Sequence, residues 1–96
     1  MYPKTCPQNP HAYYTMEEEF PNPLTVVKGF SCKDKLIGMH SQNYTEINIV
    51  LGGSGVHYIK NRCIPANTGD VFFILPDYAH GYMGDHNFEV YNILIH

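Results

Sequence analysis

The amino-acid sequence predicts a single all-β domain, a small barrel or sandwich, and three observations support this prediction. Short β-branched and aromatic stretches recur at intervals of roughly 8–12 residues from Leu24 onward. Gly, Pro, Asn and Asp separate these stretches, as is typical of tight turns. No stretch keeps a helical period for three turns. With 96 residues, of which 44% are hydrophobic, the chain can build one core but not two.

The first 23 residues are expected to form an extended arm that lies along the barrel. Five of the seven prolines fall in this segment, together with aromatic residues that include Tyr13 and Tyr14. Because proline lacks a backbone donor and fixes φ, this density disfavours a helix and a central strand. Residues 17–19, all Glu, are expected to be a solvated patch. A partly disordered terminus is the alternative to the arm.

Residues 24–96 carry the predicted strands of the barrel. Strands are expected at 24–30, 36–42, 45–51, 55–60, 63–65, 71–75, 80–83 and 88–95. Turns are expected at 52–55, 61–62, 67–70 and 76–77. In strand 45–51 the residues alternate strictly, so that one face carries Ile47, Ile49 and Leu51 and the other carries Glu46, Asn48 and Val50. We expect the face with Glu46 to point into the barrel.

Charge and composition exclude several classes of protein. Six Lys and Arg against nine Asp and Glu give a net charge of −3, and the basic residues form no stripe. Direct binding of nucleic acid by this chain is therefore not expected, since it needs concentrated positive charge. No apolar run reaches the length of a membrane span, and the first twenty residues lack a signal-peptide pattern. Three widely spaced cysteines indicate neither a disulfide framework nor a cysteine zinc site, which favours a cytoplasmic location.

Four polar residues, His40, Gln42, Glu46 and His80, are the main candidates for a site. His40 and Gln42 are two positions apart on one strand, so they share a face about 7 Å apart. His80 follows the Pro76 turn and is expected to approach from the opposite wall. A polar side chain on an inward face needs a partner, which can be a side chain, water, ligand or metal. Two imidazoles, a carboxylate and an amide oxygen also suit an open divalent-ion site.

The spacing of these residues resembles the two motifs of the cupin family. The first motif is matched by His40-x-Gln42-x3-Glu46-x6-Gly53, with Gln42 where the family has its second histidine. The second motif is matched by Gly69-Asp70, Pro76 and His80, with Tyr78 where a glycine is expected. The resemblance covers residues 39–96 and implies a small jelly-roll barrel.

A finer resemblance is to the sensor domain of AraC-type transcription regulators. The segments that carry it are 40–51, 53–59, 69–76, 80–82 and 91–94. The resemblance implies a barrel that binds a small effector, often a sugar or a related metabolite, and an arm that folds over the pocket. It also implies a helix-turn-helix DNA-binding domain, which is expected outside this chain. We also expect a homodimer, because a small barrel has exposed edge strands.

Under this interpretation the effector would contact side chains on several strands, and no residue is assigned to catalysis. The expected ligand-binding residues are His40, Gln42, Glu46, Asn48, Tyr58, His80 and Tyr82. Tyrosines would add a stacking wall, with core packing as their alternative role: Tyr44, Tyr58, Tyr82 and Tyr91. Tyr13 and Tyr14 of the arm would cover the ligand. The remaining histidines, expected at the surface or at edges, are His11, His57, His86 and His96.

Two alternatives stay open. No cofactor is required for a sensor, yet His40, Gln42, Glu46 and His80 together are the set that would hold a divalent metal. A stand-alone metal-dependent cupin enzyme, a dioxygenase or isomerase, would use His40, Glu46 and His80 as ligands. The missing second histidine of the motif argues against it. The third interpretation is a purely structural dimerisation barrel.

Overall fold

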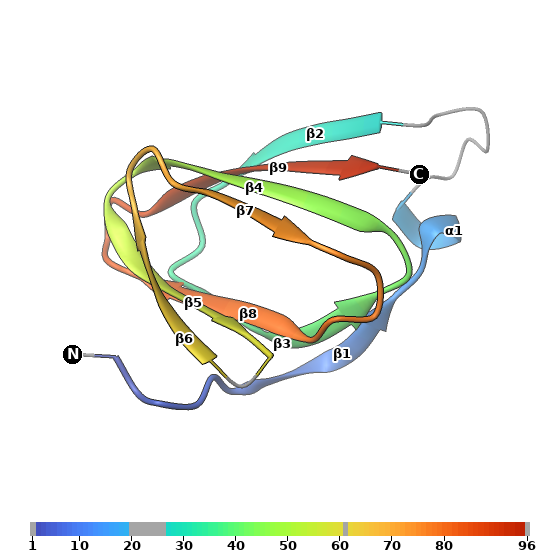
Figure 1. The fold of residues 1–96 in the computed structure, drawn as a ribbon, viewed down its shortest axis with the longest axis horizontal. Coiled ribbons are helices and arrows are strands. Elements are labelled where there is room, and N and C mark those ends of the chain that lie inside the picture. Colours follow the sequence, from blue (N-terminus) through green and yellow to red (C-terminus); the bar gives the residue numbers. More distant parts are fainter. Residues whose placement is uncertain (1, 20–26, 61, 96) are drawn as a thin grey trace.

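The computed structural model describes residues 2–19, 27–60 and 62–95, which fold into two β-sheets that face each other (Figure 1). One sheet has five strands in the order β1-β3-β8-β5-β6, and the other has four in the order β2-β9-β4-β7. The elements are β1 (Gln8–Tyr14), α1 (Met16–Glu19), β2 (Val27–Cys32), β3 (Leu36–Gln42), β4 (Thr45–Gly52), β5 (Ser54–Ile59), β6 (Arg62–Asn67), β7 (Val71–Ile74), β8 (His80–Gly84) and β9 (Glu89–Ile95). The prediction of a small all-β jelly-roll barrel is confirmed.

The predicted strands agree with the observed ones to within a few residues. β3 spans the predicted range, whereas β6 runs longer than 63–65 because it pairs with β5 along its whole length. The predicted turns at 67–70 and 76–77 use left-handed backbone at Gly69 and Asp77, with φ of 96° and 70°. Residues 24–26 of the first predicted strand, Asn61 of a predicted turn and the boundary at 23/24 lie outside the described residues.

The arm is built into the sheet rather than laid along it. β1 pairs in parallel with β3, with a register shift between Gln8 and Tyr13. Pro10 is tolerated there because β1 is an edge strand. The glutamates expected as a solvated patch lie in the single helical turn α1, a short helix that the proline-based reasoning did not predict. Thr15 and Glu18 cap this turn reciprocally, the Thr15 hydroxyl accepting from the Glu18 amide.

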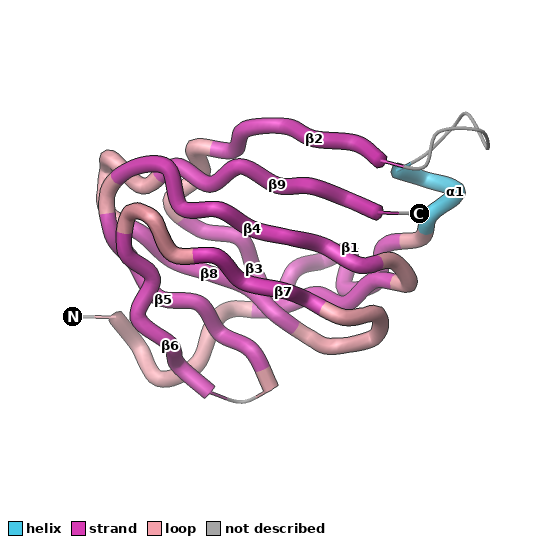
Figure 2. Tube along the Cα trace, turned by 45° about the horizontal axis from the view of Figure 1, so that its top comes forward, coloured by secondary structure: helices cyan, strands magenta, loops and turns pink. Residues whose placement is uncertain are grey.

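The N-terminal segment, residues 2–7, covers the outer face of the five-stranded sheet (Figure 2). The Tyr58 hydroxyl donates to the carbonyl of Pro3 at 2.6 Å. Cys6 packs with Val56 and Tyr58 in a buried cluster. This cluster gives β5 a buried outer side, so that the side chains on both faces of this strand are removed from water.

The four-stranded sheet alternates in polarity along each strand. Its inward side carries Val50 and Val90, which pack with Phe88 and with Tyr82 of the opposite sheet at one end of the barrel. Toward the other end the inward positions become polar, as described below. The described residues contain no helix long and apolar enough to cross a membrane.

Candidate functional site

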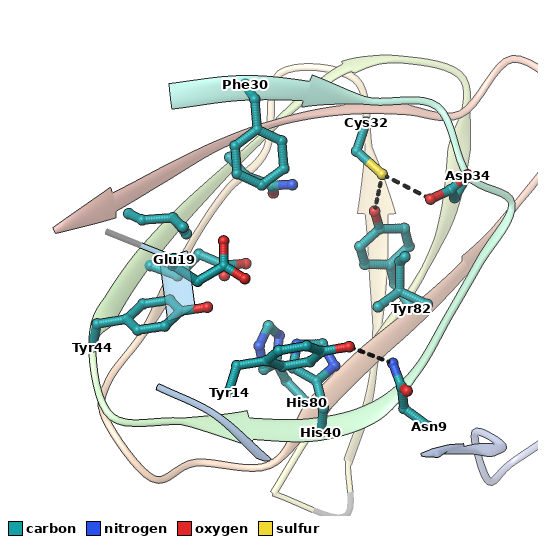
Figure 3. A pocket seen from close by; sticks show the side chains of 14 residues that line it. Asn9, Tyr14, Glu19, Phe30, Cys32, Asp34, His40, Tyr44, His80 and Tyr82 are labelled. Atoms are coloured by element: carbon teal, nitrogen blue, oxygen red, sulfur yellow. Dashed lines mark hydrogen bonds between the residues drawn. The ribbon is translucent and has the colours of Figure 1, made fainter. Parts of the chain in front are cut away.

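A pocket of about 250 Å³ opens between the two sheets (Figure 3). Aromatic and polar side chains line it together, and most come from the inner faces of the sheets. The lining residues are Asn9, Tyr14, Glu19, Phe30, Cys32, Asp34, Ile37, His40, Tyr44, Glu46, His80, Tyr82, Asn92 and Leu94. The pocket is therefore a mixed site, with a polar interior and apolar walls, of the kind that binds small molecules.

Two imidazoles from the five-stranded sheet lie together in this pocket. His40 and His80 are cross-strand neighbours on β3 and β8, and their ring centroids are 4.3 Å apart. The expectation that His80 approaches from the opposite wall is wrong, because β8 pairs directly with β3. His40 Nδ1 lies 2.8 Å from the carbonyl of Gly38. Since a carbonyl only accepts, Nδ1 carries the proton in the neutral ring and Nε2 is left as an acceptor.

The four-stranded sheet contributes a carboxylate and two amides. The Asn48 amide donates to Glu46 Oε2 and to Asn92 Oδ1, both at 2.6 Å. All three side chains are buried. Glu46 and Asn92 line the pocket, whereas Asn48 lies behind them and holds them in place. Asn92 was not among the residues predicted to bind, although alternation along 88–95 places it on the same face as Val90 and Leu94.

Gln42 joins the two sheets across the interior. It is fully buried at the end of β3, and its amide nitrogen donates to Glu46 Oε1 at 3.2 Å. Its oxygen lies 3.2 Å from Nε2 of His80, which must be the donor in this contact. A hydrogen-bonded chain thus runs from Asn92 through Asn48, Glu46 and Gln42 to His80. It leaves His80 Nδ1 buried without a partner among the described atoms.

Burial sets the protonation of this cluster. It raises the pKa of the Glu46 carboxyl, with the hydrogen bond from Asn48 and the nearby His40 acting against the rise. Burial also lowers the pKa of His80 well below its usual value, and His40 and His57 lower it further. His80 is therefore a neutral imidazole near neutral pH. Burial raises the pKa of the Tyr44 and Tyr82 phenols, so both remain hydrogen-bond donors.

His57 is a buried residue that the sequence reasoning placed wrongly. It was expected at the surface, but only 3% of it is exposed, and its ring stacks edge-on against Phe72 and Tyr82. The ring centroid is 5.7 Å from that of His80. Burial and the nearby His40 lower its pKa to about 4. Its position between Val56 and Tyr58 was a usable signal, because alternation places it opposite those two apolar residues.

The tyrosines divide between the pocket and the outside. Tyr44 and Tyr82 line the pocket as predicted positions of its wall. Tyr58 does not reach it, because it points outward from β5 to Pro3 and lines a separate groove under the N-terminal segment. Tyr91 also faces outward, since Val90 and Asn92 occupy the inner face of β9.

One tyrosine of the arm lies over the pocket and the other does not. The Tyr14 ring contacts His40 edge-on at 5.3 Å, and its hydroxyl accepts from the Asn9 amide at 3.0 Å (Figure 3). Tyr13 points away, is half exposed, and donates to Asp77 at 3.2 Å. The Asn43 side chain accepts from the Met16 amide and so fixes the start of α1 beside the mouth.

The described side chains do not fit the divalent metal that the cupin motifs imply. Across the described ranges, no group of three or more His, Cys, Asp and Glu side chains is placed to hold a metal ion. The physical reason is Gln42, whose amide lies between the Glu46 carboxylate and the His80 ring and uses both groups as partners. The four candidate ligands thus form a hydrogen-bonded chain rather than a convergent set.

Solved structures with the same fold are cupins. An RmlC-like cupin from Shewanella frigidimarina matches with a TM-score of 0.67 and 15% identity, over 73% of this chain and 66% of that one. A predicted oxalate decarboxylase from Thermotoga maritima matches with a TM-score of 0.63 and 23% identity, over 82% and 72%. The plu4264 protein from Photorhabdus luminescens matches with a TM-score of 0.65 and 25% identity, over 78% and 68%. The chain spans about two thirds of the length of these proteins.

The sequence comparison identifies the family more narrowly than the fold does. No curated protein matches the chain. The family model described as the AraC-like ligand binding domain matches residues 32–96, which include every strand from β3 to β9. Because this match covers well over half of the chain, the protein belongs to the AraC-like ligand binding domain family.

Proposed function

We propose that this chain is the effector-binding domain of an AraC-type transcription regulator. It would bind a small molecule in the pocket between the sheets and signal occupancy, as a dimer, to a DNA-binding domain outside the chain. The observation that carries the proposal is the mixed pocket itself, where Glu46, Asn92 and His40 present polar groups beneath aromatic walls. The effector would not react, but would shift a conformational equilibrium by its differential affinity, typically 1–3 kcal/mol.

The chemistry of the lining favours a neutral or cationic effector with several polar groups. Among the described lining residues there are three carboxyl groups and neither Lys nor Arg. An anionic ligand would find no charge partner there. His40 Nε2 and the Asn92 side chain offer hydrogen bonds suited to hydroxyl groups, while Phe30 and Tyr44 can pack against a ring face. A volume of about 250 Å³ suits a single ring, such as a monosaccharide or a related metabolite.

The arm gives the proposed signal a mechanical route. Tyr14 and Glu19 lie at the mouth of the pocket, and the Met16 amide is held by Asn43. A ligand that contacts Tyr14 would favour the closed position of β1 and α1 over an open one. Since β1 is an edge strand, its outer backbone groups are available to respond to that change.

The test is ligand binding by a matched pair of variants. A panel of aldopentoses, aldohexoses and small amines is screened by thermal shift, and the strongest responder is titrated calorimetrically. Glu46→Gln keeps the size and the hydrogen bonds of the side chain but removes its charge, and should weaken binding roughly 10- to 100-fold. Glu17→Gln, on the exposed side of α1, is the control and should bind as wild type does.

The result that overturns the assignment is a folded Glu46→Gln variant with unchanged affinity. The same applies if no member of the panel, neutral or cationic, raises the melting temperature of the wild-type chain. The DNA-binding partner is tested separately, by reading the gene beyond the codon for His96 for a helix-turn-helix pattern. A frame without such a pattern contradicts the regulator but leaves the effector site standing.

A further inference from the structure

The outer side of the four-stranded sheet carries a continuous apolar surface. Alternation along β2, β9, β4 and β7 brings apolar side chains into register on this side. We define the outer apolar face by nine residues: Val27, Ile47, Ile49, Leu51, Val71, Phe73, Tyr91, Ile93 and Ile95. Gly29 adds to its continuity, because a Cβ at this position would collide with the Tyr91 hydroxyl, which lies across it. The only described charge among the outward positions of these strands is Glu89, at the rim beside Ser31.

No described element lies over this face (Figure 1). Phe73 is 68% exposed, Val27 55% and Val71 48%. The other sheet is treated differently, because residues 2–7 cross its outer side and bury Val56 and Tyr58. The chain thus supplies its own cover for one apolar outer surface and leaves the second one open. An exposed apolar surface of this extent marks an interaction site.

The size and charge of the face suit a second copy of the chain. Side chains of these sizes and exposed fractions present on the order of 600 Å², close to the roughly 800 Å² that one partner contributes to a stable interface. A two-fold interface brings the same patch against itself, so any net charge on it would be repelled. The outer apolar face carries no charge at its centre, and its rim charge, Glu89, is hydrogen-bonded to Ser31.

We propose that two copies of this chain associate through the outer apolar face, sheet against sheet. Two such sheets pack about 10 Å apart with their inner side chains interdigitating, as in a β-sandwich. Phe73, the most exposed of the nine, would insert into the facing sheet, and Ile47 and Ile93 would form the centre. The face shares β4 and β9 with the pocket, since the residues between the outward ones are Glu46, Asn48 and Asn92.

The test is the oligomeric state of the 96-residue chain by sedimentation velocity over a range of concentrations. The wild-type chain should be a dimer at micromolar concentration. Phe73→Glu should raise the dissociation constant roughly 100-fold or more, because each substitution occurs twice in a two-fold interface. Phe73 is mostly exposed, so this variant should fold, and an unchanged circular dichroism spectrum checks that it does.

A second variant and a control locate the interface. Phe73→Ser introduces no charge and should weaken the dimer less than Phe73→Glu does. Leu36→Glu alters a side chain that is 44% exposed on the other sheet, and it should leave the dimer intact. A wild-type chain that stays monomeric up to millimolar concentration overturns the proposal and leaves the face to another occupant. A dimer that Leu36→Glu disrupts and Phe73→Glu does not overturns it as well.

The interface and the effector site can fail independently. The outer apolar face is formed without any ligand, so dimerisation is expected of the ligand-free chain. Phe73→Glu should retain effector binding by calorimetry, since Phe73 is absent from the pocket lining. Loss of binding in Glu46→Gln with an intact dimer supports both assignments. A dimer without any effector response supports the interface and contradicts the proposed function.

Discussion

On the inner side of β4, Glu46 and Asn48 are almost completely buried, whereas on its outer side Leu51 is about half exposed. The strand thus reverses the usual arrangement in which polar residues face water and apolar residues face the core. The inner polar groups are tolerated because nearly every one has a hydrogen-bond partner. The outer apolar groups have no such compensation within the described chain. The inner face is complete without a partner molecule apart from a few buried atoms, and the outer face is not.

The difference shows which parts of this sheet serve stability and which serve binding. A core made for stability alone would place apolar residues at positions 46, 48 and 92, since well-packed apolar groups are often as stabilising as buried polar ones. Polar residues there are instead suited to recognition of a polar molecule. The apolar residues on the outer side contribute little until something covers them.

The largest expected effect comes from breaking the inner face. In Asn48→Leu, Glu46 Oε2 and Asn92 Oδ1 both lose their donor, and we expect the free energy of unfolding to fall by about 3 kcal/mol. Urea denaturation followed by circular dichroism measures it. The matched change on the outer face, Ile49→Thr, should cost under about 1 kcal/mol. Equal losses in the two variants would contradict the contrast between the faces.

A smaller effect is expected from acidification, because His57 is buried as a neutral ring. Its pKa is near 4 in the folded chain and near 6.5 when unfolded. Between those values the unfolded chain binds a proton that the folded chain does not, so stability falls as the pH falls. At pH 5 this loss amounts to about 2 kcal/mol relative to pH 7. Glu46, with its raised pKa, acts in the opposite direction below its folded pKa.

The contribution of His57 is separated by comparing variants over the same pH range. His57→Leu fits between Phe72 and Tyr82 and should lose about 2 kcal/mol less than wild type between pH 7 and 5. His11→Gln, exposed on β1, serves as the control. Parallel pH profiles of wild type and His57→Leu, measured by urea denaturation, would show that His57 is protonated in the folded chain.

The smallest effect is expected from chelation. Because Gln42 ties Glu46 and His80 into hydrogen bonds, purified protein should contain divalent metal well below one equivalent. Dialysis against EDTA should leave the melting temperature and effector affinity unchanged. Metal analysis by mass spectrometry checks the first point. Stoichiometric Mn, Fe, Ni or Zn, lost together with binding on chelation, would refute this assignment and favour the metal-dependent enzyme.

Sequence reasoning predicted much of the barrel and the inward face of β4. Alternation within one strand reveals which residues share a face, and Glu46 and Asn48 were found in this way. It does not reveal which strand lies beside which. The pairing of β3 with β8 therefore had to come from the structure, and it moved His80 from the opposite wall to a place beside His40.

The misplacement of His57 and Tyr58 has a related cause. In β5 both faces are buried, one by the core and the other by the N-terminal segment. An apolar residue such as Tyr58 is then no longer a marker of the interior. Whether residues 2–7 cover the sheet depends on contacts distant in sequence, such as that between Pro3 and Tyr58, and these leave no local pattern.

The pairing of Asn48 with Asn92 has a consequence for how the chain finds its native structure. Along β4 and β9, isoleucine and valine occupy enough positions on both sides that a slip of one residue would still bring apolar side chains together. Such a slip would place one asparagine opposite an isoleucine and leave its amide buried without a partner. The two amides therefore discriminate between alignments that hydrophobic contacts alone would accept, and they make folding accurate rather than the product more stable.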